Sequence, residues 1–231
     1  MPEGARAERL DAVNETKRAL ILEGALRVFA RDGLREASMR AIAKEAGYTP
    51  GAIYSYFPSK EHIYAAALNE SLRRLKNATE AAASHAATAA SRYVAAGLTF
   101  FDFYDENPRD LDMGFYLFSG GMAPHGLSDE ETNRELNAAL LATLEPARNA
   151  AAELFDAEAA TRLTAEAFAH ASGLLLLRHT RRLNLFRLDA RELMHRYLTE
   201  QIDRDTVTKP EQGASALITN HTSSGNAAAD G

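Results

Sequence analysis

Hydroxyl side chains gather in one short stretch of the sequence, at Thr49, Tyr54, Ser55 and Tyr56. Hydroxyl groups, backbone amides and helix N-termini are groups that bind the phosphate oxygens of nucleic acids. Within the stretch, Pro50 and Gly51 leave a slim backbone that can approach base edges or thymine methyl groups. Two basic residues complete the set, since Arg40 can make a bidentate contact to guanine and Lys60 can contact a phosphate. The chemistry that these residues favour is recognition of nucleic acid.

The residue patterns needed for catalysis or metal binding are absent from the sequence. The chain has no cysteine, which excludes disulfides, thiolate zinc sites and a cysteine nucleophile. It also has no phosphate-binding glycine loop, no nucleophile elbow and no paired His-Glu zinc helix. His125, His170 and His179 have no spacing typical of metal ligands. We therefore expect no enzyme activity, no metal and no cofactor.

The hydrophobic pattern predicts an all-α fold, because apolar residues recur at helical spacing and alternating runs are almost absent. In the N-terminal third, an apolar stripe over 21–29 predicts a first helix that ends before Gly33. A fourth helix is expected from Lys60, with Ser59 as its N-cap.

Between these helices the sequence predicts two shorter ones. Ser38 is a good N-cap for a second helix that ends at Gly47, and Thr49 with Pro50 is a strong start signal for a third, which we expect to reach Phe57. Two short helices joined by a tight turn that contains glycine form a helix-turn-helix, whose second helix enters the major groove of DNA.

The charge distribution agrees with this interpretation. The formal net charge of the chain is -6, which taken over all residues argues against a protein coated in bases. Residues 16–60, however, hold eight bases against four acids, a balance of +4, so the acidic excess lies elsewhere. This segregation is expected when one end of a protein meets DNA.

Three segments closely resemble the DNA-binding domain of TetR-family transcriptional regulators: 21–33 (ILEGALRVFARDG), 38–47 (SMRAIAKEAG) and 51–61 (GAIYSYFPSKE). The resemblance covers residues 14–74. It implies a homodimeric, mostly repressing regulator that binds double-stranded DNA. Carried over by position, the residues that would face DNA are Ser38, Arg40, Thr49, Pro50, Gly51, Tyr54, Tyr56 and Lys60, and the hydroxyl pattern adds Ser55. Met39 and Tyr48 depart from the family pattern, which often has threonine and valine there.

The resemblance also implies a domain organisation. We expect an N-terminal extension (1–13), a helix-turn-helix DNA-binding domain (14–74) and a helical effector-binding and dimerisation domain (75–205), with the fourth helix joining the last two. From residue 206 the composition turns to small and polar residues that cannot bury enough surface to offset chain entropy, so residues 206–231 are expected to be a disordered tail.

Aromatic residues concentrate in the middle of the chain, where eight of the 18 fall between Tyr93 and Phe118. One interpretation is a packed helical core. The other is a cavity for a small apolar or aromatic effector, with one polar group to orient it. The candidates for the cavity are Phe100, Phe103, Tyr104, Phe115, Phe118, Met122 and His170.

The function that these features favour is a cytoplasmic repressor that binds a palindromic operator as a dimer and is released by a small, largely apolar effector. The resemblance places dimerisation on two helices expected at 164–181 and 189–203. No apolar run approaches the roughly 20 residues that a membrane span requires. The alternative is an all-helical protein-interaction module that keeps the fold without reading DNA. The sign of regulation, the operator and the effector are left open.

Overall fold

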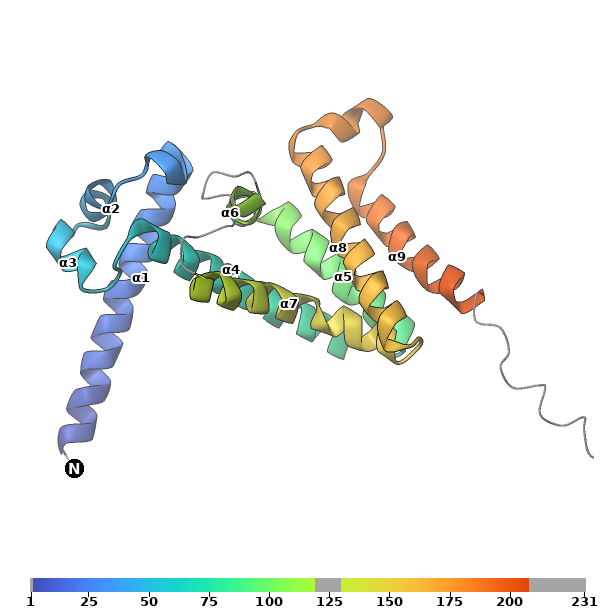
Figure 1. The fold of residues 1–231 in the computed structure, drawn as a ribbon, viewed down its shortest axis with the longest axis horizontal. Helices are drawn as coiled ribbons and strands as arrows, with labels where there is room; N and C mark the ends of the chain where they lie inside the picture. The colour runs from blue at the N-terminus through green and yellow to red at the C-terminus, as the bar shows by residue number, and fades with distance from the viewer. Residues whose placement is uncertain (1, 119–129, 208–231) are drawn as a thin grey trace, which may run out of the picture.

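The computed structural model describes residues 2–118 and 130–207 (Figure 1). Their elements are α1 (Pro2–Glu36), α2 (Met39–Ala46), α3 (Pro50–Tyr54), α4 (Lys60–Ser84), α5 (Ala89–Glu106), α6 (Pro108–Phe118), α7 (Glu130–Ala152), α8 (Ala157–His179), the 3-10 helix η1 (Arg182–Phe186) and α9 (Ala190–Val207). Strands are absent from this part of the chain, and the expected all-α class is confirmed. Met122, the side chain of Phe118 and nearly all of the expected tail lie outside the described residues.

The first helix is longer than the apolar stripe predicts, because it begins at Pro2 rather than near residue 14. Its N-terminal part extends away from the rest of the molecule (Figure 1). Near its other end, Gly33 has φ 75° and ψ 158°, which interrupts the helix where the sequence predicts its end. Residues 2–13 therefore continue α1 instead of forming a separate element.

Local capping explains α2 and α3. The Ser38 hydroxyl accepts a hydrogen bond from Ala41 N at 3.1 Å, and Gly47 ends α2 in the left-handed conformation. The Thr49 hydroxyl accepts from Ala52 N at 3.3 Å, directly before Pro50. The third helix ends at Tyr54, three residues earlier than predicted.

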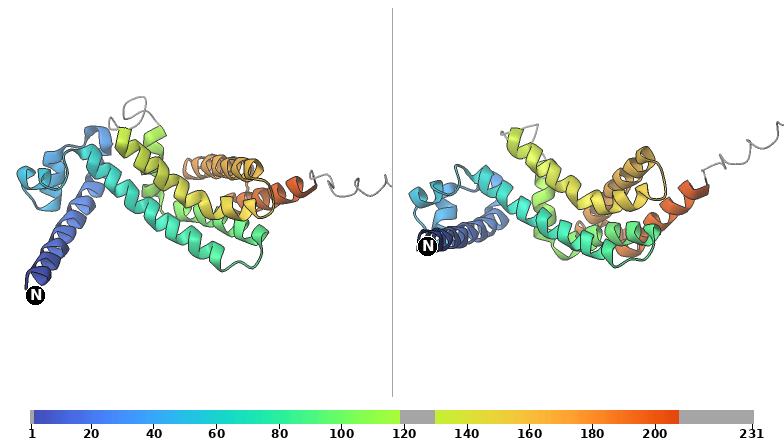
Figure 2. Two further views of the ribbon diagram at one scale, coloured as in Figure 1. Left: turned by 60° about the horizontal axis from the view of Figure 1, so that its bottom comes forward. Right: turned by 90° about the horizontal axis from the view of Figure 1, so that it is seen from below.

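Helix α4 joins two separate cores. Its first half, up to Leu72, belongs to a core built around Ile21, Ile42 and Ile53, and its second half, from Leu75, belongs to a core shared with α5, α7, α8 and α9. Helix α7 lies alongside α4 in both views of Figure 2. A shift of α4 therefore moves the first core relative to the second.

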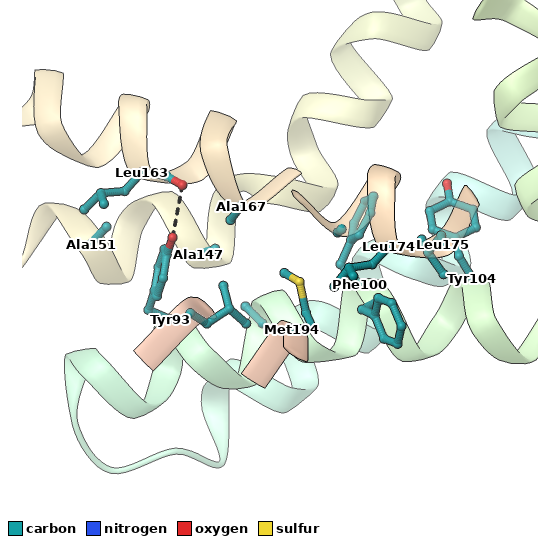
Figure 3. Packing of buried hydrophobic residues seen from close by; sticks show 14 of the residues in the cluster. Tyr93, Phe100, Tyr104, Ala147, Ala151, Leu163, Ala167, Leu174, Leu175 and Met194 are labelled. Atoms are coloured by element: carbon teal, nitrogen blue, oxygen red, sulfur yellow. Dashed lines mark hydrogen bonds between the residues drawn. The ribbon is translucent and has the colours of Figure 1, made fainter. Parts of the chain in front are cut away.

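The second core is built from alanine, leucine and aromatic side chains (Figure 3). Tyr93 crosses it from α5, and its hydroxyl, which has a single proton to donate, lies 3.0 Å from Leu163 O and 2.7 Å from Gln201 Oε1. The Tyr93 hydroxyl thus ties α5 to α8 and α9, and its burial raises the pKa of Tyr93. None of the described helices has the length and apolar character needed to cross a membrane.

Candidate nucleic-acid interface and effector cavity

Helices α2 and α3 are held at a fixed angle by buried apolar residues. Ile42 and Ile53 are fully buried in the first core, and Phe57 is buried beside them after the end of α3. Arg18 on α1 places its guanidinium 4.3 Å from the centre of the Phe57 ring, a cation–π contact. The helix-turn-helix is therefore attached rigidly to α1.

Close packing of α1 against α2 depends on a glycine that the sequence analysis did not single out. A Cβ added to Gly24 would lie 2.9 Å from Ala46 Cβ and 3.0 Å from the Ala46 backbone. Such distances are too short for any larger side chain, so Gly24 sets how closely the two helices approach. At Gly47, by contrast, an added Cβ meets nothing within 4 Å, and what favours glycine there is its left-handed φ of 76°.

Ion pairs reinforce the same crossing. Glu45 on α2 accepts hydrogen bonds from Arg27 at 2.8 Å and from Arg31 at 3.3 Å. These bonds, with that from Arg27 the stronger, hold the pKa of the Glu45 carboxyl below its usual value, and Arg31 likewise lowers the pKa of Asp32. Arg27 also pairs with Glu23. Three of the four acids in 16–60 are therefore paired with arginines of α1, and one of them, Glu45, joins α2 to α1.

The basic residues of 16–60 that do not take part in these ion pairs are exposed or lack an acidic partner among the described residues. In the described part of the chain, Lys17, Arg35, Arg40 and Lys44 form no ion pair. Arg40 and Lys44 stand one helical turn apart on α2, and both are exposed. Lys44 was missed as a candidate, although its i+4 spacing from Arg40 was a visible signal. On α2, positive charge is thus left free at Arg40 and Lys44.

Most predicted DNA-facing residues are exposed at α2, at the turn or at α3. The exposed members are Ser38, Arg40, Thr49, Pro50, Gly51, Tyr54 and Ser55. Tyr54, 55% exposed, is the large apolar side chain that this unit presents to solvent. Because the Ser38 and Thr49 hydroxyls act as acceptors in capping, each can still donate a hydrogen bond to a phosphate oxygen.

Two predicted residues have other partners. Tyr56 is half-buried against the first core, with its hydroxyl 3.5 Å from Asn14 Oδ1. Lys60 Nζ donates to three carbonyls at the end of α1, those of Leu34 (3.0 Å), Arg35 (2.8 Å) and Ala37 (2.9 Å). An ammonium has three N–H donors, so all are occupied and Lys60 acts here as a cap of α1.

A small apolar cavity of about 20 Å³ lies inside the second core. Its lining comes from α5, α7, α8 and α9: Ala96, Gly97, Phe100, Thr143, Leu144, Ala147, Thr164, Ala167, Phe168, Ala171 and Met194. Figure 3 shows Phe100, Ala147, Ala167 and Met194 around this region. The two threonines are the only hydroxyls among these lining residues, and both donate to backbone carbonyls of their own helices. The cavity fits an apolar group rather than a charged one.

Of the predicted effector residues, Phe100 lines this cavity. Tyr104 packs edge-on against the Phe100 ring, with 5.1 Å between the ring centres. Phe103 instead faces α4, where the Arg74 guanidinium lies 5.6 Å from its ring centre. Phe115 is half-buried against the second core and is not among the lining residues. Phe168, which the sequence analysis did not propose, packs edge-on against Phe100 at 5.7 Å and supplies another wall.

His170 does not reach the cavity. Its ring stacks on Tyr197 of α9 with the ring centres 3.8 Å apart and the planes 9° from parallel. Burial lowers the pKa of His170, and its Nε2 atom is buried without a hydrogen-bond partner. His170 therefore packs between α8 and α9 in this structure.

Polar contacts connect the cavity and α6 to α4. The Thr79 hydroxyl of α4 donates to the carbonyl of Thr143 at 3.1 Å, and the Thr143 side chain lines the cavity. Arg74 of α4 pairs with the buried Asp110 of α6 at 2.7 Å, and the Tyr64 hydroxyl donates to Met113 O. These last contacts border a cleft of about 760 Å³ between α1, α4 and α6. A displacement of the cavity wall at Thr143 would thus also displace α4.

Comparison with known proteins identifies the N-terminal domain. Residues 21–67 match the family model of bacterial regulatory proteins, tetR family. The uncharacterized HTH-type transcriptional regulator YuxN of Bacillus subtilis is 47% identical over 53 residues, which cover 23% of this chain and 18% of YuxN. The HTH-type transcriptional repressor KstR of Mycolicibacterium smegmatis is 36% identical over 67 residues, 29% of this chain and 33% of KstR. The chain thus spans about a fifth and a third of the lengths of these two relatives.

Solved structures extend the similarity to about four fifths of the chain. FadR from Bacillus subtilis, crystallised with stearoyl-CoA, has a TM-score of 0.61 at 19% identity and covers 80% of this chain and 97% of its own. A TetR/AcrR-family regulator from Thermobifida fusca has a TM-score of 0.60 at 22% identity and covers 81% and 97%. At these identities the likeness shows the fold. The relatives named above are transcriptional regulators, as expected for a chain that is not an enzyme.

Proposed function

Since this chain is a TetR-family transcriptional regulator by its DNA-binding domain, we propose that it binds a palindromic operator as a homodimer in the cytoplasm and represses transcription. The observation that carries the proposal is that two basic side chains on α2, Arg40 and Lys44, are exposed and form no ion pair among the described residues. They lie beside the exposed hydroxyls at the start of α3. In the dimer, two α3 helices enter successive major grooves about 34 Å apart. Dimerisation uses α8 and α9, which pack together as a helical hairpin.

The effector is a small, largely apolar molecule that occupies the cavity beside Phe100 and Phe168. At about 20 Å³ the cavity is far below the 300 Å³ or more of typical ligand sites, so binding must enlarge it. The stearoyl-CoA bound by FadR, a structural neighbour, supports an apolar chain as the ligand class.

Release from DNA follows from a shift between two conformations. An effector that binds better to the enlarged cavity displaces Thr143 and, through its hydrogen bond, Thr79 on α4. Because the first half of α4 packs in the same core as α2 and α3, this displacement would move α3 in each protomer. The two α3 helices of the dimer would then no longer match the spacing of successive major grooves. The effector can shift this equilibrium only by its differential affinity for the two conformations.

Fluorescence anisotropy with DNA from the region upstream of the gene tests the DNA-binding part. We expect the wild-type protein to bind one segment specifically, and the double variant Arg40→Ala, Tyr54→Phe to lose that binding. Arg134→Ala, an exposed position on α7, serves as the matched control and keeps wild-type affinity. Failure of the wild type to prefer any upstream segment would contradict the proposal and would favour a protein-interaction module.

The effector part is tested separately with stearoyl-CoA, free stearate and small aromatic acids as probes. One of these is expected to weaken operator binding by at least tenfold, which corresponds to a coupling free energy of about 1.4 kcal/mol. Ala167→Leu, which fills the cavity, should remove the response and leave the affinity for DNA without probe unchanged. A response that survives in Ala167→Leu would place the effector elsewhere.

A further inference from the structure

The connection between α8 and α9 exposes a group of large apolar side chains. We call residues 180–188 the tip, because they lie at the end of the α8–α9 hairpin, away from α2 and α3 (Figure 1). Within the tip, Leu185, Phe186 and Leu188 are 81%, 65% and 54% exposed. Large apolar side chains that gather in solvent mark a surface that contacts a partner.

The backbone of the tip holds these side chains in a defined shape. On either side of η1, Arg181 and Arg187 have φ angles of 59° and 52°, in the left-handed region that non-glycine residues rarely adopt. Between them, the buried side chain of Leu183 anchors η1 to the second core. Because a left-handed arginine costs free energy, the surrounding structure must hold it in place. The tip is therefore a built projection.

Positive charge surrounds the apolar side chains. Residues 180–188 hold three arginines and no acid. All three, Arg181, Arg182 and Arg187, are exposed, and none forms an ion pair in the described part of the chain. Arg178 and Arg191, which flank the tip, pair instead with aspartates of α5. The tip itself thus carries three uncompensated positive charges.

A lipid surface fits this combination better than a second protein does. A stable protein interface takes about 20 to 30 residues on each side, far more than the tip offers. Insertion into the boundary between headgroups and acyl chains needs only a few leucine and phenylalanine side chains. Anionic headgroups also neutralise arginines in any arrangement, whereas a protein must place an acid opposite each one. The chemistry of the tip therefore favours an anionic bilayer.

We propose that the tip docks on the surface of an anionic lipid bilayer. Leu185, Phe186 and Leu188 enter the boundary between headgroups and acyl chains, and the three arginines of the tip bind lipid phosphates. Each basic residue near such a surface contributes roughly fivefold to affinity, so three contribute on the order of 100-fold over a neutral bilayer. The proposal goes beyond regulation of transcription, since the tip contains no residue of α2, of α3 or of the cavity lining.

A single introduced fluorophore tests the contact, because the chain contains no tryptophan. Phe186→Trp places the fluorophore on the tip. Leu141→Trp, on α7, is the matched control, since Leu141 is 64% exposed. Each full-length variant is mixed with unilamellar vesicles of equal parts phosphatidylglycerol and phosphatidylcholine, or of phosphatidylcholine alone. Tryptophan emission and cosedimentation are measured, and circular dichroism verifies that the variants fold as the wild type does.

We expect the emission of Phe186→Trp to move to shorter wavelength on the vesicles that contain phosphatidylglycerol, and brominated lipid to quench it. The emission of Leu141→Trp should stay unchanged. Replacing Arg181 and Arg187 together by asparagine, which tolerates the left-handed conformation, should weaken cosedimentation on the order of 25-fold. Arg134→Gln, exposed on α7, should bind vesicles as the wild type does.

Four results would overturn the proposal. Cosedimentation without a change in the emission of Phe186→Trp would place the contact on another basic surface, such as that of α2. Equal affinity for the two kinds of vesicle would exclude recognition of anionic lipid. Absence of binding to both would favour a protein partner for the tip. Emission of Phe186→Trp that is already at short wavelength without lipid, and that reverts on dilution, would show that a second copy covers the tip.

Discussion

Replacing Lys60 by methionine separates a structural role for this residue from a contact to DNA. Methionine keeps much of the aliphatic stem but removes the three N–H donors that bind the carbonyls of Leu34, Arg35 and Ala37. A hydrogen bond from a charged donor contributes about 1.5 to 3 kcal/mol when buried. These carbonyls are partly reached by solvent, which can replace some of the lost bonds. We therefore expect a total loss of about 2 to 3 kcal/mol, or a fall in Tm on the order of 5 to 10 °C.

The assay combines thermal unfolding, followed by circular dichroism, with operator binding over a range of salt concentrations. If Lys60 caps α1, Lys60→Met unfolds at a lower temperature than the wild type, but the slope of log affinity for DNA against log salt concentration keeps its wild-type value. Lys44→Met is the matched control, because Lys44 is exposed on α2 without an ion-pair partner in the described residues. It should unfold at the wild-type temperature and lower the slope by about 0.9 for each protomer. A Lys60→Met variant that behaves as expected for Lys44→Met would refute the capping role.

Three further predictions concern the helix crossing, its ion pairs and the cavity. Gly24→Val should lower the free energy of unfolding by about 1 to 3 kcal/mol in urea titrations, because its side chain overlaps the backbone of Ala46; an unchanged midpoint would contradict the close crossing. The pKa of Glu45 is lowered in the folded protein, so its ion pairs stabilise the fold fully at a pH above its ordinary pKa of 4.5. This stabilisation is lost as the pH falls through the lower pKa of the folded state. The Tm should therefore fall more steeply below pH 4.5 in the wild type than in Glu45→Gln. Phe168→Ala should destabilise the second core by about 3 kcal/mol and create an apolar void, so that benzene raises the Tm of the variant and not that of the wild type.

The parts of the fold that were predictable from the sequence depend on neighbouring residues. Ser38 and Thr49 accept hydrogen bonds from amides three positions later, and Gly47 ends α2 through its own backbone conformation. Such signals are complete within a few residues, so α2 and the start of α3 were predicted correctly. The start of α1 was not, since residues 2–13 lack an apolar stripe like that over 21–29.

Tertiary partners explain the differences at the candidate sites. The sequence predicts a phosphate contact for Lys60 because the carbonyls that it binds, 23 to 26 residues earlier, become its neighbours only when α4 packs against α1. His170 and Phe168 are two positions apart on α8 and so point to different sides, one toward Tyr197 and the other toward Phe100. Choosing between them required knowing which side of α8 faces α5. The position of Gly24 against Ala46 likewise depends on the crossing of two helices rather than on local pattern.

The most direct test of the proposed regulator is methylation protection of guanine N7 in the upstream DNA, since N7 lies in the major groove. A dimer that reads successive major grooves through α3 should protect guanines in two clusters whose centres are one helical turn, about 34 Å, apart. Protection should disappear in the variant Arg40→Ala, Tyr54→Phe. Absence of protection at any wild-type concentration, or the same two clusters in that variant, would contradict DNA recognition through α2 and α3.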